Sequence, residues 1–205
     1  MRQVFLLSPA RCDGRRAQTL LNPAASFALA EELRNADGAA LGDVFAFLSG
    51  LYFRGKLTYA RHFARSAVGA SVAPVSIITT DRGLVAAELR VRPDDLAAFS
   101  AVDIGRADDR YRAPLRRSAL ALAEHVDDDV CVVLLGSIAT GKYADVLLEV
   151  FGSRLLFPLD FVGRGDMSRG GLMLRCVREG RELEYVSIDG AVRRGKRPPK
   201  LVPIR

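Results

Sequence analysis

Four short apolar segments, separated by stretches with helical periodicity, constrain the fold of this chain more than any other feature. The segments, each followed by a polar or Gly/Pro turn, are Val4–Leu7, Val75–Thr79, Val130–Leu135 and Arg154–Phe157. Apolar residues recur three and four positions apart in Ala24–Arg34, Asp43–Leu48, Lys56–Arg65, Leu115–Val126 and Tyr143–Phe151. Buried strands that alternate with helices are typical of a parallel sheet covered on both faces. The sequence therefore predicts an α/β fold with a mostly parallel sheet flanked by helices.

Residues 182–192 alternate polar and apolar side chains around Asp189 and Gly190, which predicts a late β-hairpin with its turn at that pair. The mixed-charge stretch Asp103–Arg112 is expected to be a surface loop. The sequence shows no internal repeat, and 205 residues suit one domain of ordinary size. We therefore expect a single domain over residues 1–192, followed by a basic tail over residues 193–205.

The excess of positive over negative charge in the chain comes from this tail. The net charge is +6, and six of the 30 Lys and Arg residues lie in residues 193–205, where there is no acidic residue. The preceding 192 residues therefore carry 24 basic and 24 acidic side chains. A basic arm of this kind is a common way to hold phosphate backbones, so the tail is expected to contact nucleic acid.

The composition excludes several classes of protein and site. Three separated cysteines and two histidines argue against a disulfide framework and against a zinc or histidine-rich metal cluster. We expect neither a metal nor a cofactor. The apolar run Val4–Leu7 is far shorter than the ~18 residues of a membrane span, so the chain is expected to be soluble, without a membrane partner, and cytoplasmic.

The loop after the third apolar segment, Gly136–Tyr143, resembles a phosphate-binding loop. It fits the pattern GxxxxGK[ST] except at the last position, where Tyr143 replaces the hydroxyl that normally ligates magnesium. Three interpretations stay open: a nucleotide-hydrolysing loop, a loop that holds a phosphate through Gly141, Lys142 and the following helix N-terminus, or a plain strand-to-helix turn.

Residues 51–65 carry four basic side chains and no acid. If a helix runs through them, Arg54 and Arg61 share one stripe while Leu57 faces the core. Such a stripe is either a solvated helix face or a phosphate-binding surface. The neighbouring Tyr52 and Phe53 favour the second interpretation, because aromatic rings beside cations can stack on bases.

A third segment, Pro158–Leu174, contains four glycines, two arginines and two aspartates after the fourth apolar segment. Open α/β sheets bind ligands at the carboxyl ends of their strands. We therefore expect this segment to be a loop that converges with the loops Ser8–Arg16, Thr80–Gly83 and Gly136–Tyr143. The alternative for each aspartate is a helix cap or a local turn.

Short motifs in these segments support a family resemblance. Leu6-Leu-Ser-Pro-Ala10 and Leu48-Ser-Gly-Leu-Tyr52 resemble motifs of the peroxide-stress YaaA-like proteins. The spacing of Gly136, Tyr143 and residues 158–165 is similar to a small domain of archaeosine-synthase-like proteins. The resemblance implies an α/β fold whose relatives bind DNA or process nucleobases. The chain departs from the pattern at Asp81 and Arg82, and residues 166–169 have no counterpart in it.

These observations favour a DNA glycosylase-like enzyme that cleaves the N-glycosidic bond of an extruded, damaged or modified base in DNA, in repair or phage defence. Such an enzyme needs a carboxylate, a donor to the departing base, base-binding groups and phosphate clamps. The candidate carboxylates are Asp81 and Asp166, and the candidate donors are Arg82 and Arg164. The candidate base-binding residues are Ser8, Tyr52, Phe53 and Tyr143. The candidate phosphate clamps are Arg54, Lys56, Arg61, Ser137, Lys142 and Arg169. The alternatives are a phosphate-loop nucleotide hydrolase or transferase and a non-enzymatic DNA-binding stress protein.

Overall fold

A six-stranded sheet forms the centre of the computed structural model, which describes residues 2–64, 73–105, 108–199 and 201. The order of its strands is β4-β3-β1-β6-β7-β8. Their bounds are Arg2–Leu7 for β1, Val75–Ile78 for β3, Leu84–Ala86 for β4, Val130–Leu135 for β6, Leu155–Pro158 for β7 and Tyr185–Ser187 for β8. The four inner strands are parallel and the two edge strands are antiparallel to their neighbours. The predicted α/β class and the mostly parallel sheet are confirmed.

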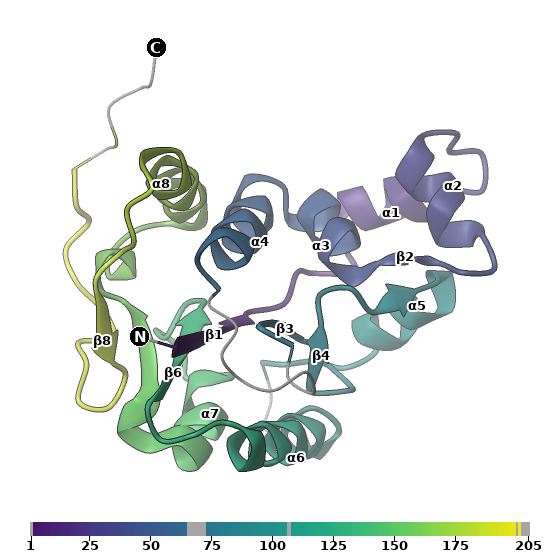
Figure 1. The fold of residues 1–205 in the computed structure, drawn as a ribbon. Helices are drawn as coiled ribbons and strands as arrows, with labels where there is room; N and C mark the ends of the chain where they lie inside the picture. Colours follow the sequence, from purple (N-terminus) through teal and green to yellow (C-terminus); the bar gives the residue numbers. More distant parts are fainter. Residues whose placement is uncertain (1, 65–72, 106–107, 200, 202–205) are drawn as a thin grey trace.

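Helices cover both faces of this sheet (Figure 1). On one face lie α3 (Leu41–Ser49), α4 (Leu51–Phe63) and α8 (Asp166–Glu179), and on the other lie α6 (Asp109–His125) and α7 (Ala144–Phe151). Beyond the β4 edge lie α1 (Arg15–Leu21), α2 (Ala28–Arg34), α5 (Pro93–Ser100) and the short antiparallel pair β2 (Ala39–Ala40) and β5 (Arg90–Val91). Single 3₁₀ turns, η1 (Gly152–Arg154) and η2 (Leu159–Phe161), flank β7.

The alternation of side chains along β1 divides the apolar core into two parts. Phe5 and Leu7 face the layer that contains α3, α4 and α8, whereas Val4 and Leu6 pack with α6 and α7. All four side chains are buried. This two-sided burial explains why β1 appears in the sequence as a continuous apolar run rather than an alternating pattern. None of the helices in the described part of the chain is long and apolar enough to cross a membrane.

The predicted late hairpin is confirmed as an antiparallel pair at the end of the sheet, but its partner strand differs from the expectation. β8 pairs with β7, with Phe157 opposite Val186. Asp189 and Gly190 form the expected turn, yet residues 191–199 contain no strand. The expectation that residues 182–192 form both arms of the hairpin is therefore wrong, because the open edge of β7 provides the hydrogen-bonding partner.

Two segments expected to be loops are partly helical. Residues 109–112 belong to α6, and residues 166–174 belong to α8 despite their two adjacent glycines. The basic helix begins at Leu51 rather than Lys56 and is described as far as Phe63, while Arg65 lies outside the described residues.

The order of the strands creates a topological switch point between β1 and β6. After β1 the chain forms β3 on one side of it, and later returns to form β6 on the other side. β1 and β6 are paired in register from Arg2 and Val130 to Leu7 and Leu135. The connections that leave these two strands diverge beyond their carboxyl ends, which is where open α/β sheets form ligand crevices.

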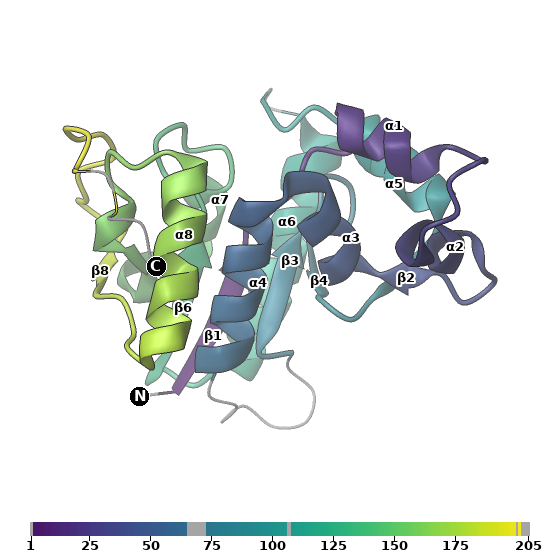
Figure 2. The ribbon, with the colours of Figure 1, turned by 90° about the horizontal axis from the view of Figure 1, so that it is seen from above.

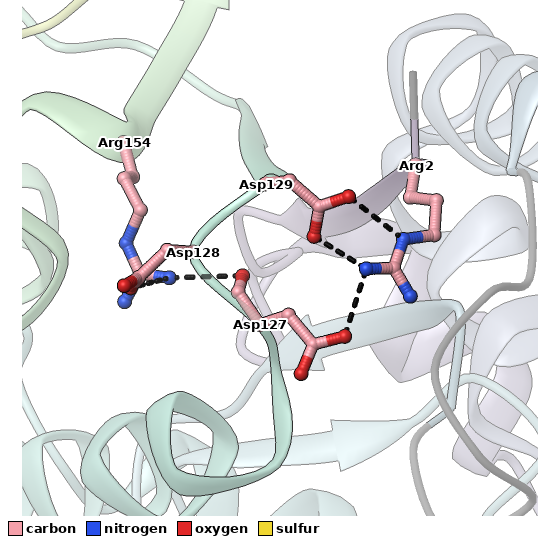
Figure 3. Close-up of polar contacts among 5 residues, drawn as sticks. All are labelled: Arg2, Asp127, Asp128, Asp129 and Arg154. Carbon is pink, nitrogen blue, oxygen red and sulfur yellow. Dashed lines mark hydrogen bonds and ion pairs between the residues drawn. The ribbon is translucent and has the colours of Figure 1, made fainter.

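At the opposite, amino-terminal edge of the same two strands, an acidic turn of residues 127–129 makes ion pairs with neighbouring arginines (Figure 3). Arg2 of β1 makes ion pairs with Asp127 and Asp129, at 2.8 Å for Asp127. Arg154 donates to the carbonyl oxygen of Asp127 at 3.1 Å and lies 3.3 Å from Asp128 Oδ1. The acidic run therefore joins β1, β6 and the 3₁₀ turn directly before β7.

Candidate functional site

A pocket of about 740 Å³ opens at the topological switch point, and we call it the switch-point pocket. It is formed by the ends of β1 and β6, the start of α1, the α3–α4 junction and the start of α8. Its volume lies in the range of small-molecule and cofactor sites. Six of the residues selected from the sequence line it: Ser8, Tyr52, Ser137, Lys142, Tyr143 and Asp166.

The expected convergence of four loops is observed, with one loop in a neighbouring pocket. The loops that begin at Ser8, at Gly136 and after η2 all contribute to the switch-point pocket. Thr80, from the turn after β3, lines an adjoining pocket of about 550 Å³. Arg11 and Lys142 line both pockets. The carboxyl ends of β1, β3, β6 and the segment after β7 therefore open on one side of the sheet.

A buried lysine lies directly behind the pocket wall. Lys56 is only 1% exposed, and its Nζ donates to the carbonyl oxygen of Ser8 at 2.5 Å and lies 2.9 Å from Ser8 Oγ. The same amine is 4.6 Å from the ring centre of Tyr52 and 4.5 Å from that of Phe53. Because Ser8 lines the pocket, the contact with Lys56 fixes the position of the Ser8 hydroxyl in the pocket wall.

This position makes the prediction of Lys56 as a phosphate clamp wrong. Its amine is enclosed by protein atoms and cannot reach a bound strand. Phe53 is also unable to stack on a base, since its ring is fully buried and contacts Phe45 edge-on. Instead, the aromatic pair selected for stacking packs around the lysine, with Tyr52 presenting a 7% exposed side to the pocket.

Burial of Lys56 lowers its pKa to about 7, with Asp166 acting to raise the pKa and Arg169 to lower it. Above pH 7 the folded protein therefore releases this proton, whereas the unfolded chain keeps it up to the ordinary pKa of 10.5. The free energy of unfolding should then rise with pH in this window, because the unfolded state binds more protons.

The variant Lys56→Met should lack this contribution. Between about pH 6 and about pH 8, the free energy of unfolding of the wild-type protein should increase by about 1 kcal/mol more than that of the variant. Urea unfolding of both proteins at the two pH values measures the difference, and all other titrating groups are shared. An equal change in the two proteins would contradict the neutral state of Lys56.

The loop between β6 and α7 is held by its own hydrogen bonds. Ser137 N donates to the hydroxyl of Tyr143 at 2.9 Å, Gly141 N to the carbonyl oxygen of Ile138 at 3.4 Å, and Ala139 N contacts Ser137 Oγ at 3.5 Å. A phosphate cradle needs such amides free to point at the ligand. In addition, Asp145 places a carboxylate in the first turn of α7. These contacts favour the strand-to-helix turn over a nucleotide-hydrolysing loop.

Tyr143 is a wall of the pocket rather than a replacement for a magnesium ligand. Its side chain is 8% exposed, and its ring packs over Gly136, where a Cβ would lie 3.0 Å from Tyr143 Cε2. Burial raises the pKa of its hydroxyl, and the nearby carboxylate of Asp166 adds to this effect. The tyrosine therefore stays protonated and presents a neutral hydroxyl group.

Close packing of two helices brings Asp166 to the pocket. α4 and α8 lie side by side above the sheet, as Figure 2 shows. They touch through Gly55 and Gly170: a Cβ on Gly55 would lie 2.7 Å from Gly170 O, and a Cβ on Gly170 would lie 2.6 Å from Leu51 O. No larger residue fits at this contact unless the helices separate. The glycines thus place the first turn of α8 beside the Tyr52 end of α4.

The first turn of α8 carries the carboxylate of the site. The side chain of Asp166 is 67% exposed, and its Oδ1 lies 3.6 Å from Nη1 of Arg169. Arg169 is buried and donates from Nε and Nη2 to the carbonyl oxygen of Phe161, at 3.1 and 2.9 Å. The arginine is therefore a fixed cation that orients Asp166, and it is not a free phosphate clamp.

Basic side chains dominate the rim of the pocket. Arg11, Arg15, Arg16 and Lys142 line it, and among the described residues Asp166 is its only acidic lining residue. Arg11 pairs with Asp13 at 2.9 Å, and Arg16 donates to the carbonyl oxygen of Phe47 at 2.9 Å. Sequence reasoning selects the loop after β1 but not the individual arginines in it. Their position directly after a strand end was the feature that could have identified them. The resulting field suits an anionic ligand.

The remaining selected residues lie elsewhere. Asp81 and Arg82, in the turn after β3, line neither pocket; Arg82 instead pairs with Asp95 at 2.6 Å and lies over the ring of Phe99. Arg54 and Arg61 are exposed on α4, where Arg61 pairs with Glu88 at 3.3 Å. Arg164 lines a separate basic pocket. The structure therefore does not bring these five residues to the switch-point pocket.

Within the described residues, no three His, Cys, Asp or Glu side chains are grouped in a way that would hold a metal ion. Comparison of the chain with protein-family models, with curated proteins and with solved structures finds no match. The resemblance to YaaA-like and archaeosine-synthase-like proteins, which depends on short motifs, therefore stays a prediction.

Proposed function

We propose that the chain is a DNA glycosylase-like hydrolase, which cleaves the N-glycosidic bond of a nucleotide extruded into the switch-point pocket. The observation that carries the proposal is the carboxylate of Asp166, which is the one acidic side chain among the described residues of a pocket lined by four basic side chains and two tyrosines. A nucleotide combines the two features that this pocket matches, a polyanionic backbone and a flat base with polar edges.

The positions of the charged and polar groups around the pocket support one orientation of the bound nucleotide. Arg15 and Lys142 belong to its basic set, make no ion pair with a described residue, and are proposed to bind phosphate oxygens. The hydroxyls of Ser8 and Tyr143 are fixed by Lys56 and by Ser137 N, so they offer preorganised hydrogen bonds to the edge of a base. The base is thus proposed to lie against Ser8 and Tyr143, with its phosphates toward α1 and Lys142.

In the proposed reaction, Asp166 stabilises the positive charge that develops on the sugar and orients the attacking water. The C1′–N bond breaks and its electron pair leaves with the base. The oxygen of water bonds to C1′, and one proton of that water ends on the departing base. A carboxylate held near a developing cation is among the most effective devices for this kind of step. The ion pair with Arg169, at 3.6 Å, holds the Asp166 carboxylate in place.

The test is base release by the wild-type protein from duplex DNA. Unmodified DNA, DNA with deaminated, alkylated or oxidised bases, and hypermodified phage DNA are incubated with the protein. Free base is detected by chromatography, and abasic sites are detected by alkali-dependent strand breakage. Release from at least one substrate is expected. DNA binding without release from any substrate would overturn the proposal and favour the non-enzymatic DNA-binding protein.

A further inference from the structure

A second pocket, of about 450 Å³, is lined by the loop before α8, by Arg169 of α8 and by the chain that follows β8, and we call it the arginine basin. Its basic lining residues are Arg164, Arg169, Arg193, Arg194 and Arg197. No acidic residue is among its described lining residues. The rest of its wall is made of three glycines and Ala139, so the guanidinium groups surround a space with little side-chain bulk.

The chain that follows β8 is built into this basin rather than extending freely from the domain. Gly163 has φ +73°, and a Cβ there would lie 2.2 Å from the carbonyl oxygen of Lys196. A Cβ on Gly195 would lie 2.7 Å from Val162 Cγ1. Arg164 Nη1 also lies 3.5 Å from the carbonyl oxygen of Pro199. These close approaches fix the backbone of residues 195–199 against the loop between η2 and α8.

Three of the five arginines have acidic partners. Arg164 lies 3.7 Å from Asp160, Arg169 lies 3.6 Å from Asp166, and Arg193 lies 2.7 Å from Asp145. Arg194 and Arg197 are exposed and make no ion pair with any residue that the structure describes. The basin therefore keeps about two positive charges that none of the described residues neutralises.

One donor of the basin is also unsatisfied. Nε of Arg164 is buried and makes no hydrogen bond within the described part of the chain, although the side chain as a whole is 12% exposed. A buried guanidinium N–H without an acceptor is costly, so the described residues do not fully satisfy the Arg164 side chain. Guanidinium groups match the oxygens of a phosphate in pairs, which an ammonium group does not.

The basin and the switch-point pocket are joined by one ion pair. Asp166 lines the switch-point pocket, Arg169 lines the basin, and their charged groups are 3.6 Å apart. A nucleotide in the first site would therefore place the strand that continues from it near the second. This adjacency is what connects the two sites to one ligand.

We propose that the arginine basin binds a backbone phosphate of the DNA strand whose nucleotide occupies the switch-point pocket. The choice of DNA rests on the proposed function, whereas the phosphate chemistry rests on the basin itself. Phosphate groups reach such a site either within a strand or on a free nucleotide, and the experiment separates these two sources.

The experiment measures the binding of unmodified duplex DNA, which requires no base release, as a function of salt concentration. The test protein carries Arg194→Gln and Arg197→Gln, and the control carries Arg117→Gln and Arg178→Gln, two exposed arginines outside the basin with the same loss of charge. The basin variant should bind DNA several-fold more weakly and lower the salt slope by roughly 1, at about 0.9 per phosphate contact. The control should keep the wild-type slope.

A parallel arm measures the binding of pyrophosphate and of a deoxynucleoside monophosphate by calorimetry. An equal loss of DNA affinity in both double variants would overturn the proposal, because it would show an effect of net charge alone. Loss of pyrophosphate binding with unchanged DNA binding would also overturn it in favour of a free nucleotide phosphate. A loss of DNA affinity in the basin variant but not in the control supports the proposal whether or not the protein releases a base. The experiment therefore separates a failure of this proposal from a failure of the proposed glycosylase function.

Discussion

Replacing Asp166 with Asn is expected to lower the rate of base release at least about a hundredfold, because the variant loses the only carboxylate that lines the switch-point pocket in the described residues. Asn keeps the shape of the side chain and removes its charge. Since the side chain is 67% exposed, its ion pair with Arg169 should contribute little to stability. Single-turnover kinetics on the substrate with the fastest release measures the effect, with thermal unfolding and DNA affinity as checks on the fold.

Asp81→Asn provides the matched comparison. Asp81 was selected from the sequence on the same grounds as Asp166, but its carboxylate lines neither pocket and lies 3.5 Å from Arg82. This variant should therefore keep most of the activity. Full activity in the Asp166 variant, or a large loss confined to the Asp81 variant, would contradict the assignment of the catalytic carboxylate while leaving the reaction class to be judged on base release itself.

The sheet was predictable because burial on two faces leaves a strong mark on a sequence. β1, β3, β6 and β7 are short runs in which nearly every side chain is buried, and a run of this kind stands out against polar turns. The location of the site followed from the same pattern, since parallel strands bring their carboxyl ends to one edge. Ser8 and the loop that carries Ser137 and Tyr143 are placed at this edge by the same reasoning, because they follow β1 and β6.

The burial of individual side chains was not predictable from the same reasoning. Lys56 follows the basic pattern of its helix, yet it is enclosed because α8 packs across α4 at this point. Phe53, next to Tyr52, is turned fully into the core. A helical pattern gives the direction of a side chain relative to its own axis, whereas its exposure depends on which other helix arrives from a distant part of the chain.

The same packing allows a helix at the start of α8, where the local sequence predicts a loop. Gly170 and Gly171 lower the intrinsic helix propensity, so the local sequence argues against a helix. Tertiary contact overrides this preference, because only a glycine at Gly170 allows the close approach to Leu51 and Tyr52. Packing therefore requires a glycine at position 170 but not at position 171, and substitutions at the two positions can measure this difference.

Gly170→Ala is expected to lower the free energy of unfolding by about 1–3 kcal/mol, the usual cost of forcing an extra group into a filled interface. The new Cβ would lie 2.6 Å from Leu51 O and 2.9 Å from Tyr52 Cα, which are backbone atoms that cannot rotate away. The helices must separate, and Asp166 moves with α8. Urea unfolding measures the loss of stability, and base release should fall as well because the carboxylate no longer sits correctly in the pocket.

Gly171→Ala is the control on the adjacent residue of the same helix. Among the described residues, its Cβ would meet only Leu201 Cδ1, at 3.7 Å, which is an ordinary contact. Within a helix interior, replacing glycine by alanine should raise the free energy of unfolding by roughly 0.5–1 kcal/mol. The two neighbouring substitutions should therefore have opposite signs. Equal effects would show that α4 and α8 do not meet through Gly170, and the placement of Asp166 at the switch-point pocket would then lose its structural basis.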